Sequence, residues 1–301
     1  MRNIPFILIK FILIPVFISV LSTSLYTLIY VAQANAQEKN KNKKSEPIII
    51  QNKTLLFDDL KQVPDTVKAM TIINGKTFVG YNGKTYMLAS MDIELETGDY
   101  AREGKDLLEQ LIQDKILIIF QTKNKKFGRQ NRMGHNIVHV LRETDQTWIQ
   151  ASLIANGVAR VRTTPFNPEQ ATQMLVHEEK ARTNKTGLWK EEAYTILTQD
   201  NAEESIGGFH VVEGVIKKVA TTKNNIYLNF GDTWKTDFTV GVTPKTRRIL
   251  SKKNISPITW SGKKIRVRGW IRSYNGPYIE LTHAEQIQII EDKPDAPNNQ
   301  E

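Results

Sequence analysis

Two Asn-Gly pairs, at residues 74–75 and 82–83, constrain the fold of this chain most strongly. Each pair interrupts short runs in which apolar residues cluster or alternate. Asn-Gly is a strong signal for a two-residue hairpin turn, because both residues tolerate a positive φ. The sequence therefore predicts three strands in succession, at residues 70–73, 77–81 and 85–91.

After these hairpins, the apolar residues switch between helical and extended spacing. Helical spacing predicts a helix at residues 100–112. Gly157 is typical of the position that stops a helix, and Pro168 of the position that starts one. The remaining predicted elements are strands at residues 115–120, 136–142 and 158–162, and helices at residues 148–156 and 168–183. This order predicts a mainly β fold with helices (α+β), built on a small five-stranded barrel.

Several short motifs within residues 71–189 then become specific. They are Trp148-Ile149-Gln150, Gly-Val-Ala-Arg-Val at 157–161, Glu-Lys-Ala-Arg at 179–182 and Gly-Leu-Trp at 187–189. In this order they resemble the staphylococcal nuclease (thermonuclease, SNase-like) family, which implies an OB-fold domain at residues 66–197. The resemblance also implies phosphodiester hydrolysis by carboxylate-bound calcium, a glutamate that activates or positions water, and two arginines that bind phosphate.

Most matched positions of that implied site carry other residue types. Lys76 stands where the family has one calcium carboxylate, and Met87 where it has an arginine. Asp92 keeps the second calcium carboxylate, so it is the candidate metal ligand. Leu95 stands at the position of the catalytic glutamate. Glu94 or Glu96 would replace that glutamate only after a shift of one residue, which in an extended chain turns the side chain to the opposite face.

The second arginine has two candidate registers, residues 125–129 and residues 131–135. The second register leaves about the same interval to Gly157 as the family shows, and it puts His135 in place of the arginine. Histidine has an ordinary pKa near 6.5 and is a poor fixed cation at neutral pH. The catalytic candidates are thus Glu94 and His135. We expect a degenerate nuclease without a cofactor, whereas an active site would need Ca²⁺.

A second all-β pattern occupies residues 207–292. Its predicted strands are residues 209–219, 226–230, 237–242, 263–273 and 278–282. Five strands fit a second small OB-like β-barrel, although no motif in it is specific to a family. Lysine and arginine outnumber the acidic residues there, and the whole chain carries a net charge of +9.

One strand of this basic domain alternates cations with apolar residues, so its cations share a face. Such a face is suited to single-stranded nucleic acid when aromatic side chains offer stacking surfaces. The alternative is a solvated basic face over a core that buries the aromatics. The candidate cations are Lys263, Lys264, Arg266, Arg268 and Arg272, and the candidate aromatics are Tyr227, Phe230, Trp234, Trp270 and Tyr274.

The N-terminal segment predicts export. Arg2 and Lys10 precede an uncharged run at residues 11–30, and Ala34-Asn35-Ala36 has the small-x-small form of a cleavage site. Residues 1–36 are therefore a signal peptide or a membrane anchor, residues 37–65 a polar linker and residues 293–301 a tail. The chain has no cysteine, so disulfides and thiol chemistry are excluded.

Two classes of function remain. The first is a non-catalytic cell-envelope module, periplasmic or secreted, that binds single-stranded nucleic acid, another polyanion or a protein, and meets a membrane only through its N-terminal segment. The second is an active secreted metal-dependent nuclease with an atypical site. The sequence leaves open whether the chain is an enzyme, but the substituted positions favour the first class.

Overall fold

The computed structural model describes residues 46–51, 57–94, 98–233 and 235–290. The predicted signal peptide or anchor, much of the linker, Leu95, Trp234 and the tail lie outside these residues. The described residues from Pro47 onward form one compact unit. Within the described parts of the chain, no helix is long and apolar enough to cross a membrane.

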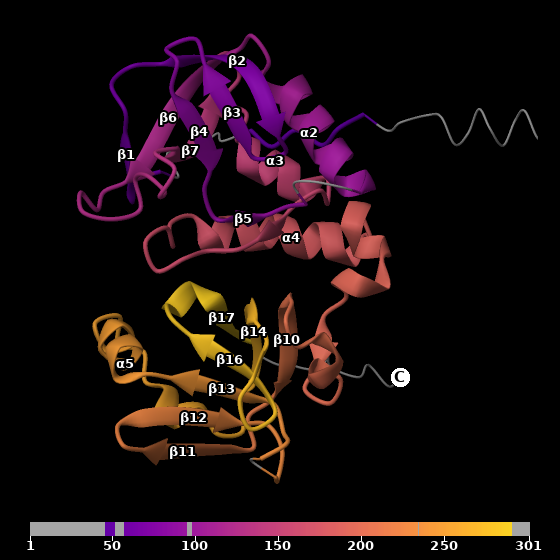
Figure 1. Cartoon of the computed structure of the whole chain (residues 1–301), viewed down its shortest axis with the longest axis vertical. Helices are drawn as coiled ribbons and strands as arrows, with labels where there is room; N and C mark the ends of the chain where they lie inside the picture. Colours follow the sequence, from indigo (N-terminus) through magenta and orange to yellow (C-terminus); the bar gives the residue numbers. More distant parts are fainter. Residues whose placement is uncertain (1–45, 52–56, 95–97, 234, 291–301) are drawn as a thin grey trace, which may run out of the picture. The chain divides into compact units, whose positions relative to one another are not determined.

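The first group of strands closes into a ring (Figure 1). β2 pairs with β3, β3 with β4, β4 with β7, β7 with β6, and β6 again with β2. The pair β4–β7 is parallel and the others are antiparallel. The strands are β2 (Val67–Asn74), β3 (Thr77–Gly80), β4 (Thr85–Leu88), β6 (Ile116–Thr122) and β7 (Asn136–Arg142), with β1 (Leu60–Gln62) added beside β6. The five-stranded arrangement predicted for this part of the chain is therefore present.

Helices pack against this ring and complete its core. Leu108, Leu111 and Ile112 of α2 are buried, and every residue of α3 is buried. Trp148 lies in the same core. The helices are α2 (Asp99–Ile112), α3 (Ile149–Ala155) and α4 (Ala171–Thr183). The mixed α+β class is confirmed.

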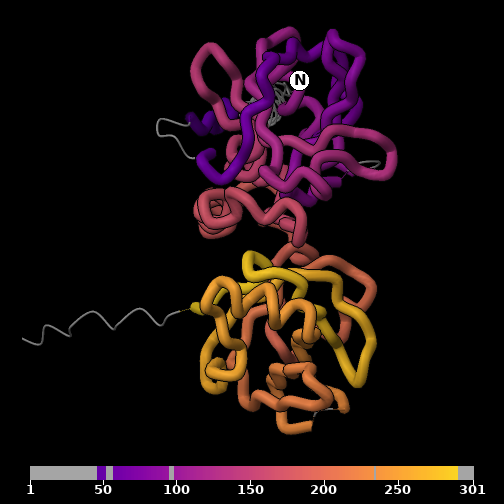
Figure 2. The backbone as a smooth tube through the Cα atoms, turned by 90° about the vertical axis from the view of Figure 1, so that its left-hand side faces the viewer, coloured from indigo at the N-terminus to yellow at the C-terminus, as the bar shows by residue number. Residues whose placement is uncertain are grey.

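The second group of strands repeats the order of the first. Figure 2 shows the orange-to-yellow part of the chain folding back on itself to form it. β10 and β11 follow one another as the first strand, and pairing then runs β11–β12–β13–β16–β15, while β14 returns to β10. The pair β13–β16 is parallel. The strands are β10 (Phe209–Val215), β11 (Lys218–Thr222), β12 (Asn225–Asn229), β13 (Thr239–Val242), β14 (Lys264–Trp270), β15 (Arg272–Ser273) and β16 (Pro277–Leu281), with β9 (Leu197–Thr198) beside β10 and β17 (Ile287–Ile289) beside β14.

This second order is consistent with the expected OB-like domain, and its apolar residues form a separate core. A short helix, α5 (Pro244–Ser251), lies between β13 and β14 and was not predicted. Its start signal is nevertheless present in the sequence, because Thr243 caps the helix by accepting the N–H of Thr246 and Pro244 fills the first turn. The domain boundaries at residues 66–197 and 207–292 stay predictions.

The two Asn-Gly pairs turn the chain for different reasons. Gly83 has φ 73° and open space around its Cα, so a positive φ is what requires glycine there. At Gly75 a Cβ would lie 2.6 Å from Cδ1 of Ile93, so close packing is what requires glycine. Both hairpins form, but neither loop is the predicted two-residue Asn-Gly turn: the first consists of Gly75 and Lys76, and the second of residues 81–84.

Two predicted boundaries are wrong for identifiable reasons. The strand predicted at residues 85–91 breaks after Leu88, because Ser90 adopts φ 61° and redirects the chain into β5 (Met91–Asp92). The last helix of the first group starts at Ala171 rather than at Pro168, since Gln170 at its N-cap has φ 62°. The kink at Ser90 matters for the site because it sets the direction of Asp92.

Gly157 brings two motifs that are distant in the sequence, residues 157–161 and 187–189, into contact. It follows α3 with φ 67°, as its predicted role requires. A Cβ at this position would lie 2.1 Å from the carbonyl oxygen of Thr186, and the N–H of Leu188 donates to Gly157 O at 2.8 Å. The Gly-Leu-Trp segment thus packs directly on the end of α3 and buries Trp189.

Candidate functional site

Asp92 is held by two arginines. β5 pairs with β8 (Arg160–Val161), which places Asp92 opposite Arg160. Nη2 of Arg160 lies 2.5 Å from Oδ2 of Asp92, and Nη1 of Arg162 lies 3.1 Å from Oδ1. Both carboxylate oxygens therefore already accept charge-assisted hydrogen bonds from guanidinium groups.

Lys76 adds a third cation near this carboxylate. Its N–H donates to Oδ1 of Asn74 at 3.1 Å, and its carbonyl oxygen accepts the N–H of Leu88 at 2.8 Å, which fixes the turn beside β4. Burial lowers the pKa of Lys76, whereas the charge of Asp92 raises it. The ammonium group and the Asp92 carboxylate thus interact electrostatically, with Lys76 at the position implied for a calcium carboxylate.

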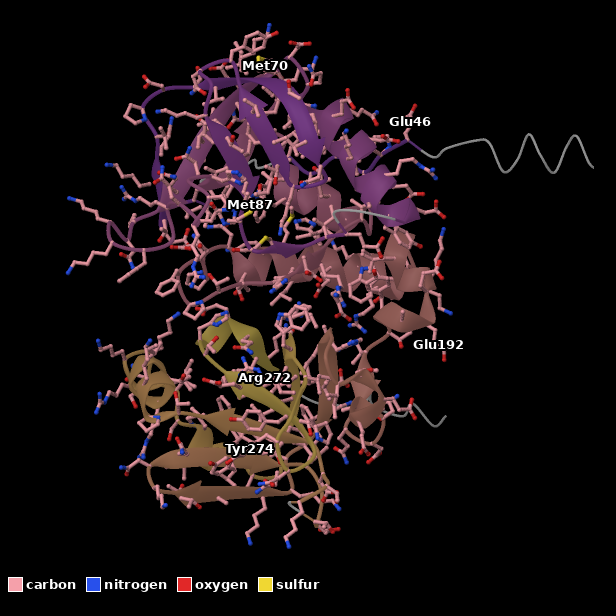
Figure 3. All side chains as sticks on the ribbon, viewed as in Figure 1. Glu46, Met70, Met87, Glu192, Arg272 and Tyr274 are labelled. Carbon is pink, nitrogen blue, oxygen red and sulfur yellow. The ribbon has the colours of Figure 1, made fainter. Side chains whose placement is uncertain are left out.

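Met87 lies on β4 and is labelled in Figure 3. Sδ of Met87 lies 3.9 Å from Nδ2 of Asn131, and Oδ1 of Asn131 accepts the N–H of His135 at 3.0 Å. Arg129 points elsewhere, because its Nε donates to the carbonyl oxygen of Thr122 at 3.1 Å. The turn at residues 131–135 is therefore the one that reaches the neighbourhood of Met87.

Glu94 is engaged on its own side of the site. It accepts a hydrogen bond from the hydroxyl of Tyr194, and the burial of that tyrosine, followed by this bond, raises the pKa of Tyr194. The Tyr194 ring also lies 4.8 Å from the guanidinium carbon of Arg160. Leu95, predicted to replace the catalytic glutamate, lies outside the described residues.

Aromatic rings of the second strand group cover the two arginines. Phe209 and Trp270 pair across β10 and β14. The guanidinium carbon of Arg160 lies 5.2 Å from the Phe209 ring centroid, and that of Arg162 lies 5.4 Å from the Trp270 ring centroid. Such cation–π contacts add stabilisation that increases as the charge is desolvated. We call Asp92, Arg160 and Arg162 the Asp92 cluster.

The residues present do not fit a calcium ion. Ca²⁺ takes six to eight oxygen ligands. In the described ranges, no group of three or more histidine or acidic side chains could hold a metal. Asp92 is the one matched carboxylate, both its oxygens accept from arginine, and Lys76 brings a positive charge to the neighbouring ligand position.

The predicted basic strand is β14, and acidic partners meet its face. Arg268 is 2% exposed, and its guanidinium lies 2.9 Å from Oε2 of Glu178 on α4. Arg266 pairs with Glu213 and Glu179 at 2.7 and 2.9 Å. Alternation thus places these cations together as expected, but in ion pairs.

The remaining predicted cations differ among themselves. Lys264 lies 2.8 Å from Glu213. Lys263 is exposed, and Arg272 is 67% exposed with Glu280 3.7 Å away. Whether these residues bind nucleic acid stays a prediction, and Lys263 and Arg272 are the two that solvent reaches most freely.

An exposed basic loop between β6 and β7 was not predicted as a binding surface. Residues 123–142 contain no acidic residue. At the loop tip the ring of Phe127 stacks on that of Phe166, with centroids 5.2 Å apart, and both are about half exposed at 56% and 45%. Lys125 and Lys126 precede Phe127 and are exposed, as is Arg132. We call these five residues the loop patch.

The loop patch has a defined backbone support. Gly128 has φ 85°, and its carbonyl oxygen accepts Nδ2 of Asn167 at 2.9 Å. The carbonyl oxygen of Asn167 in turn accepts the hydroxyl of Ser90 at 2.8 Å. The sequence signal that would have revealed this patch is an aromatic residue inside an acid-free basic run.

A five-stranded ring with this pairing order and with helices packed on it is consistent with an OB-type fold. Residues 82–191 match the family model described as staphylococcal nuclease homologue, so this part of the chain is an SNase-like domain. β2 and β3 lie before the matched range but belong to the same ring. No curated protein matches the chain.

Proposed function

We propose that this protein is an exported module that binds single-stranded nucleic acid through its SNase-like domain without hydrolysing it. An SNase-like domain is a nuclease-like, nucleic-acid-binding type of module. The observation that carries the binding is the loop patch, where a stacked and half-exposed Phe127–Phe166 pair lies next to Lys125 and Lys126, in a run (residues 123–142) that contains no acidic residue. Basic grooves with aromatic platforms are what single strands require.

The proposed loss of catalysis rests on the Asp92 cluster. Phosphodiester hydrolysis builds negative charge that cations must offset at the reacting phosphate. Here Arg160 and Arg162 already neutralise Asp92, and Met87 offers no cation. Losing one transition-state donor costs about 10²- to 10³-fold in rate. The substituted positions together support a binding role over turnover.

Location outside the cytoplasm is part of the proposal and rests on residues 1–36. Arg2, Lys10 and Ala34-Asn35-Ala36 support an export signal. Any membrane contact would come from this segment. The polyanion met in the cell envelope would be nucleic acid that reaches that compartment.

Binding and hydrolysis are tested on one sample of the purified chain. A labelled single-stranded oligonucleotide should bind with an affinity that falls steeply as salt rises, because phosphate contacts release counterions. The same oligonucleotide should stay intact with calcium present. Calcium-dependent cleavage at ordinary nuclease rates, abolished by Asp92→Ala, would instead establish the active enzyme.

Variants of the loop patch assign the binding to its residues. Phe127→Ala should weaken binding by about 1–3 kcal/mol, the value of one base stacked on an aromatic ring. Replacing Lys125 and Lys126 by alanine should lower the salt slope by roughly 0.7 per lost phosphate contact. The matched control replaces Lys105 and Lys190, two exposed lysines elsewhere in the domain, and should leave affinity and slope unchanged.

A further inference from the structure

The outer face of the second strand group carries three tyrosines around two neighbouring pockets. Tyr227 lies on β12, Tyr278 on β16, and Tyr274 follows β15. The pockets have volumes of about 440 and 360 Å³, within the usual range of ligand sites. Tyr227 and Tyr274 line both pockets and therefore separate them. Figure 3 labels Tyr274 and Arg272 on this part of the molecule.

Small neighbours leave room around these rings. Tyr227 pairs with Ala220 on one side and with Gly241 on the other. A Cβ on Gly241 would lie 1.9 Å from the Tyr278 hydroxyl oxygen, so glycine lets that ring lie against β13. Burial raises the pKa of Tyr278 to about 12, which keeps its phenol protonated and able to donate. The tyrosine rings thus stay accessible in the pockets, which residues larger than Ala220 and Gly241 would fill.

The turn that carries Tyr274 has a fixed shape. Asn275 and Gly276 have φ 50° and 89°. A Cβ on Gly276 would lie 2.5 Å from the carbonyl oxygen of Thr236, so the turn packs closely on the preceding loop. The rings of Tyr274 and Tyr278 lie 5.3 Å apart in an edge-to-face arrangement. Tyr274 is 55% exposed although its backbone is held in place.

The two pockets repeat one combination of groups. The first contains Lys218 and the amide of Asn229, and the second contains Arg272 and the amide of Asn225. Each pocket therefore combines a tyrosine wall, an amide and one cation. Each pocket also has one acidic side chain near a cation. Asp232 lines the first pocket, with its carboxylate 2.8 Å from Nζ of Lys217, and Glu280 lines the second, 3.7 Å from Nη1 of Arg272. A chain whose every unit has a planar face and one negative charge matches this repetition.

We propose that this tyrosine face is a second binding site for single-stranded nucleic acid, separate from the loop patch, with a base stacked in each pocket and phosphates at Lys218 and Arg272. The ligand class rests on the function proposed above. Stacking on tyrosine is tolerant of sequence because every base has a π-face, while asparagine can bond base edges. Neutral sugars lack the charge that both cations would meet.

The test separates the two sites by working in two backgrounds. The probe is a short labelled oligothymidylate, added to the full chain and to the Lys126→Ala/Phe127→Ala variant. That variant should retain salt-sensitive binding. Adding Tyr274→Ala should weaken the remaining affinity about 5- to 150-fold, the loss expected for one stacked base. Tyr274→Trp in the same background should restore it.

Tyr81→Ala is the control, because Tyr81 is 58% exposed but belongs to the first strand group. This variant should leave the affinity unchanged. If Tyr274→Ala leaves the oligothymidylate affinity unchanged in both backgrounds, the tyrosine face is not a nucleic acid site. The proposed function would still stand if the loop variant alone lowered that affinity. Absence of binding by the unaltered chain would overturn both proposals. Displacement of the oligothymidylate from the loop variant by a neutral oligosaccharide would overturn the ligand class.

Discussion

The two strand groups share one pairing order, but the charged residues at Asp92 and at the tyrosine face are arranged differently. Around β5 and β8 of the first group, Asp92 is closed off by Arg160 and Arg162. On the outer face of the second group, Arg272 remains exposed beside two open pockets. The family match, residues 82–191, includes only part of the first group, and the two pockets lie on the second. Pairing order alone therefore does not tell which surface is free to bind a ligand.

Contacts between the groups account for part of this difference. Arg268 of β14 reaches Glu178 of α4 and donates to the carbonyl oxygen of Val161 at 2.9 Å. Oε1 of Glu178 also accepts the N–H of Val161 at 2.7 Å. Arg268, which the sequence pattern assigned to ligand binding, thus holds β8, α4 and β14 together. Burial, which sequence alternation does not reveal, separates the structural cations from the exposed ones.

The largest expected effect comes from breaking the buried pair. Arg268→Ala leaves Glu178, whose side chain is 6% exposed, without its positive partner. Removing one member of a buried ion pair costs about 3–5 kcal/mol. Denaturant unfolding of both proteins should show that loss as a lower midpoint. A change below about 1 kcal/mol would mean that the two strand groups do not depend on this contact.

The sequence predicted the order of the elements well because local signals determine it. Gly157 stops a helix and Asn82-Gly83 makes a turn in the structure as they do in the pattern. Contacts between residues distant in sequence were not predictable in this way. Arg162 meets Asp92 across 70 positions, and the Phe127–Phe166 stack joins two separate loops. Tertiary packing, not local propensity, creates both.

The helix α5 is a different kind of omission. Thr243 and Pro244 form a recognisable helix start. The helix that follows has only eight residues, too few to show helical periodicity in its apolar positions. In the candidate site, the substituted positions were identified from the motif alone, but their partners were not, because partner choice depends on side-chain reach in the folded chain.

Acid should destabilise the contact between the strand groups next most strongly. Burial lowers the pKa of His283 to about 4. Its Nε2 lies 2.7 Å from the hydroxyl of Thr163, and its Nδ1 lies 2.8 Å from the hydroxyl of Thr282. The unfolded chain takes up a proton near pH 6.5, but the folded chain does so only near pH 4. Stability therefore falls between these values as pH decreases, by about 1.4 kcal/mol per unit at most.

The measurement compares unfolding free energies of the unaltered chain and His283→Asn between pH 7 and pH 4. His139 also titrates late, since burial lowers its pKa to about 3. Its contribution is common to both proteins and cancels in the difference. Parallel pH profiles of the two proteins would contradict the role given to His283.

A smaller effect is expected at the Asp92 cluster. Asp92→Asn removes the charge that both arginines contact, and hydrogen bonds to charged groups contribute about 1.5–3 kcal/mol. Thermal unfolding should show that loss equally in excess calcium and in chelator. Calcium that raises the midpoint of the unaltered chain but not of Asp92→Asn would instead make Asp92 a metal ligand and favour the active nuclease.

The smallest change in stability is expected at Arg272, although the sequence pattern treats it like Arg268. Its side chain is 67% exposed, with Nη1 3.7 Å from Oε2 of Glu280, and exposed pairs contribute about 0–1 kcal/mol. Arg272→Ala should therefore leave the unfolding midpoint almost unchanged. The same variant should lower the salt slope of oligothymidylate binding by roughly 0.7, the value of one phosphate contact. Arg248→Ala, at an exposed position on α5, provides the control for loss of one positive charge. Equal slopes in both variants would show that Arg272 acts only through net charge, and the contrast between buried and ligand-facing arginines would then fail at this position.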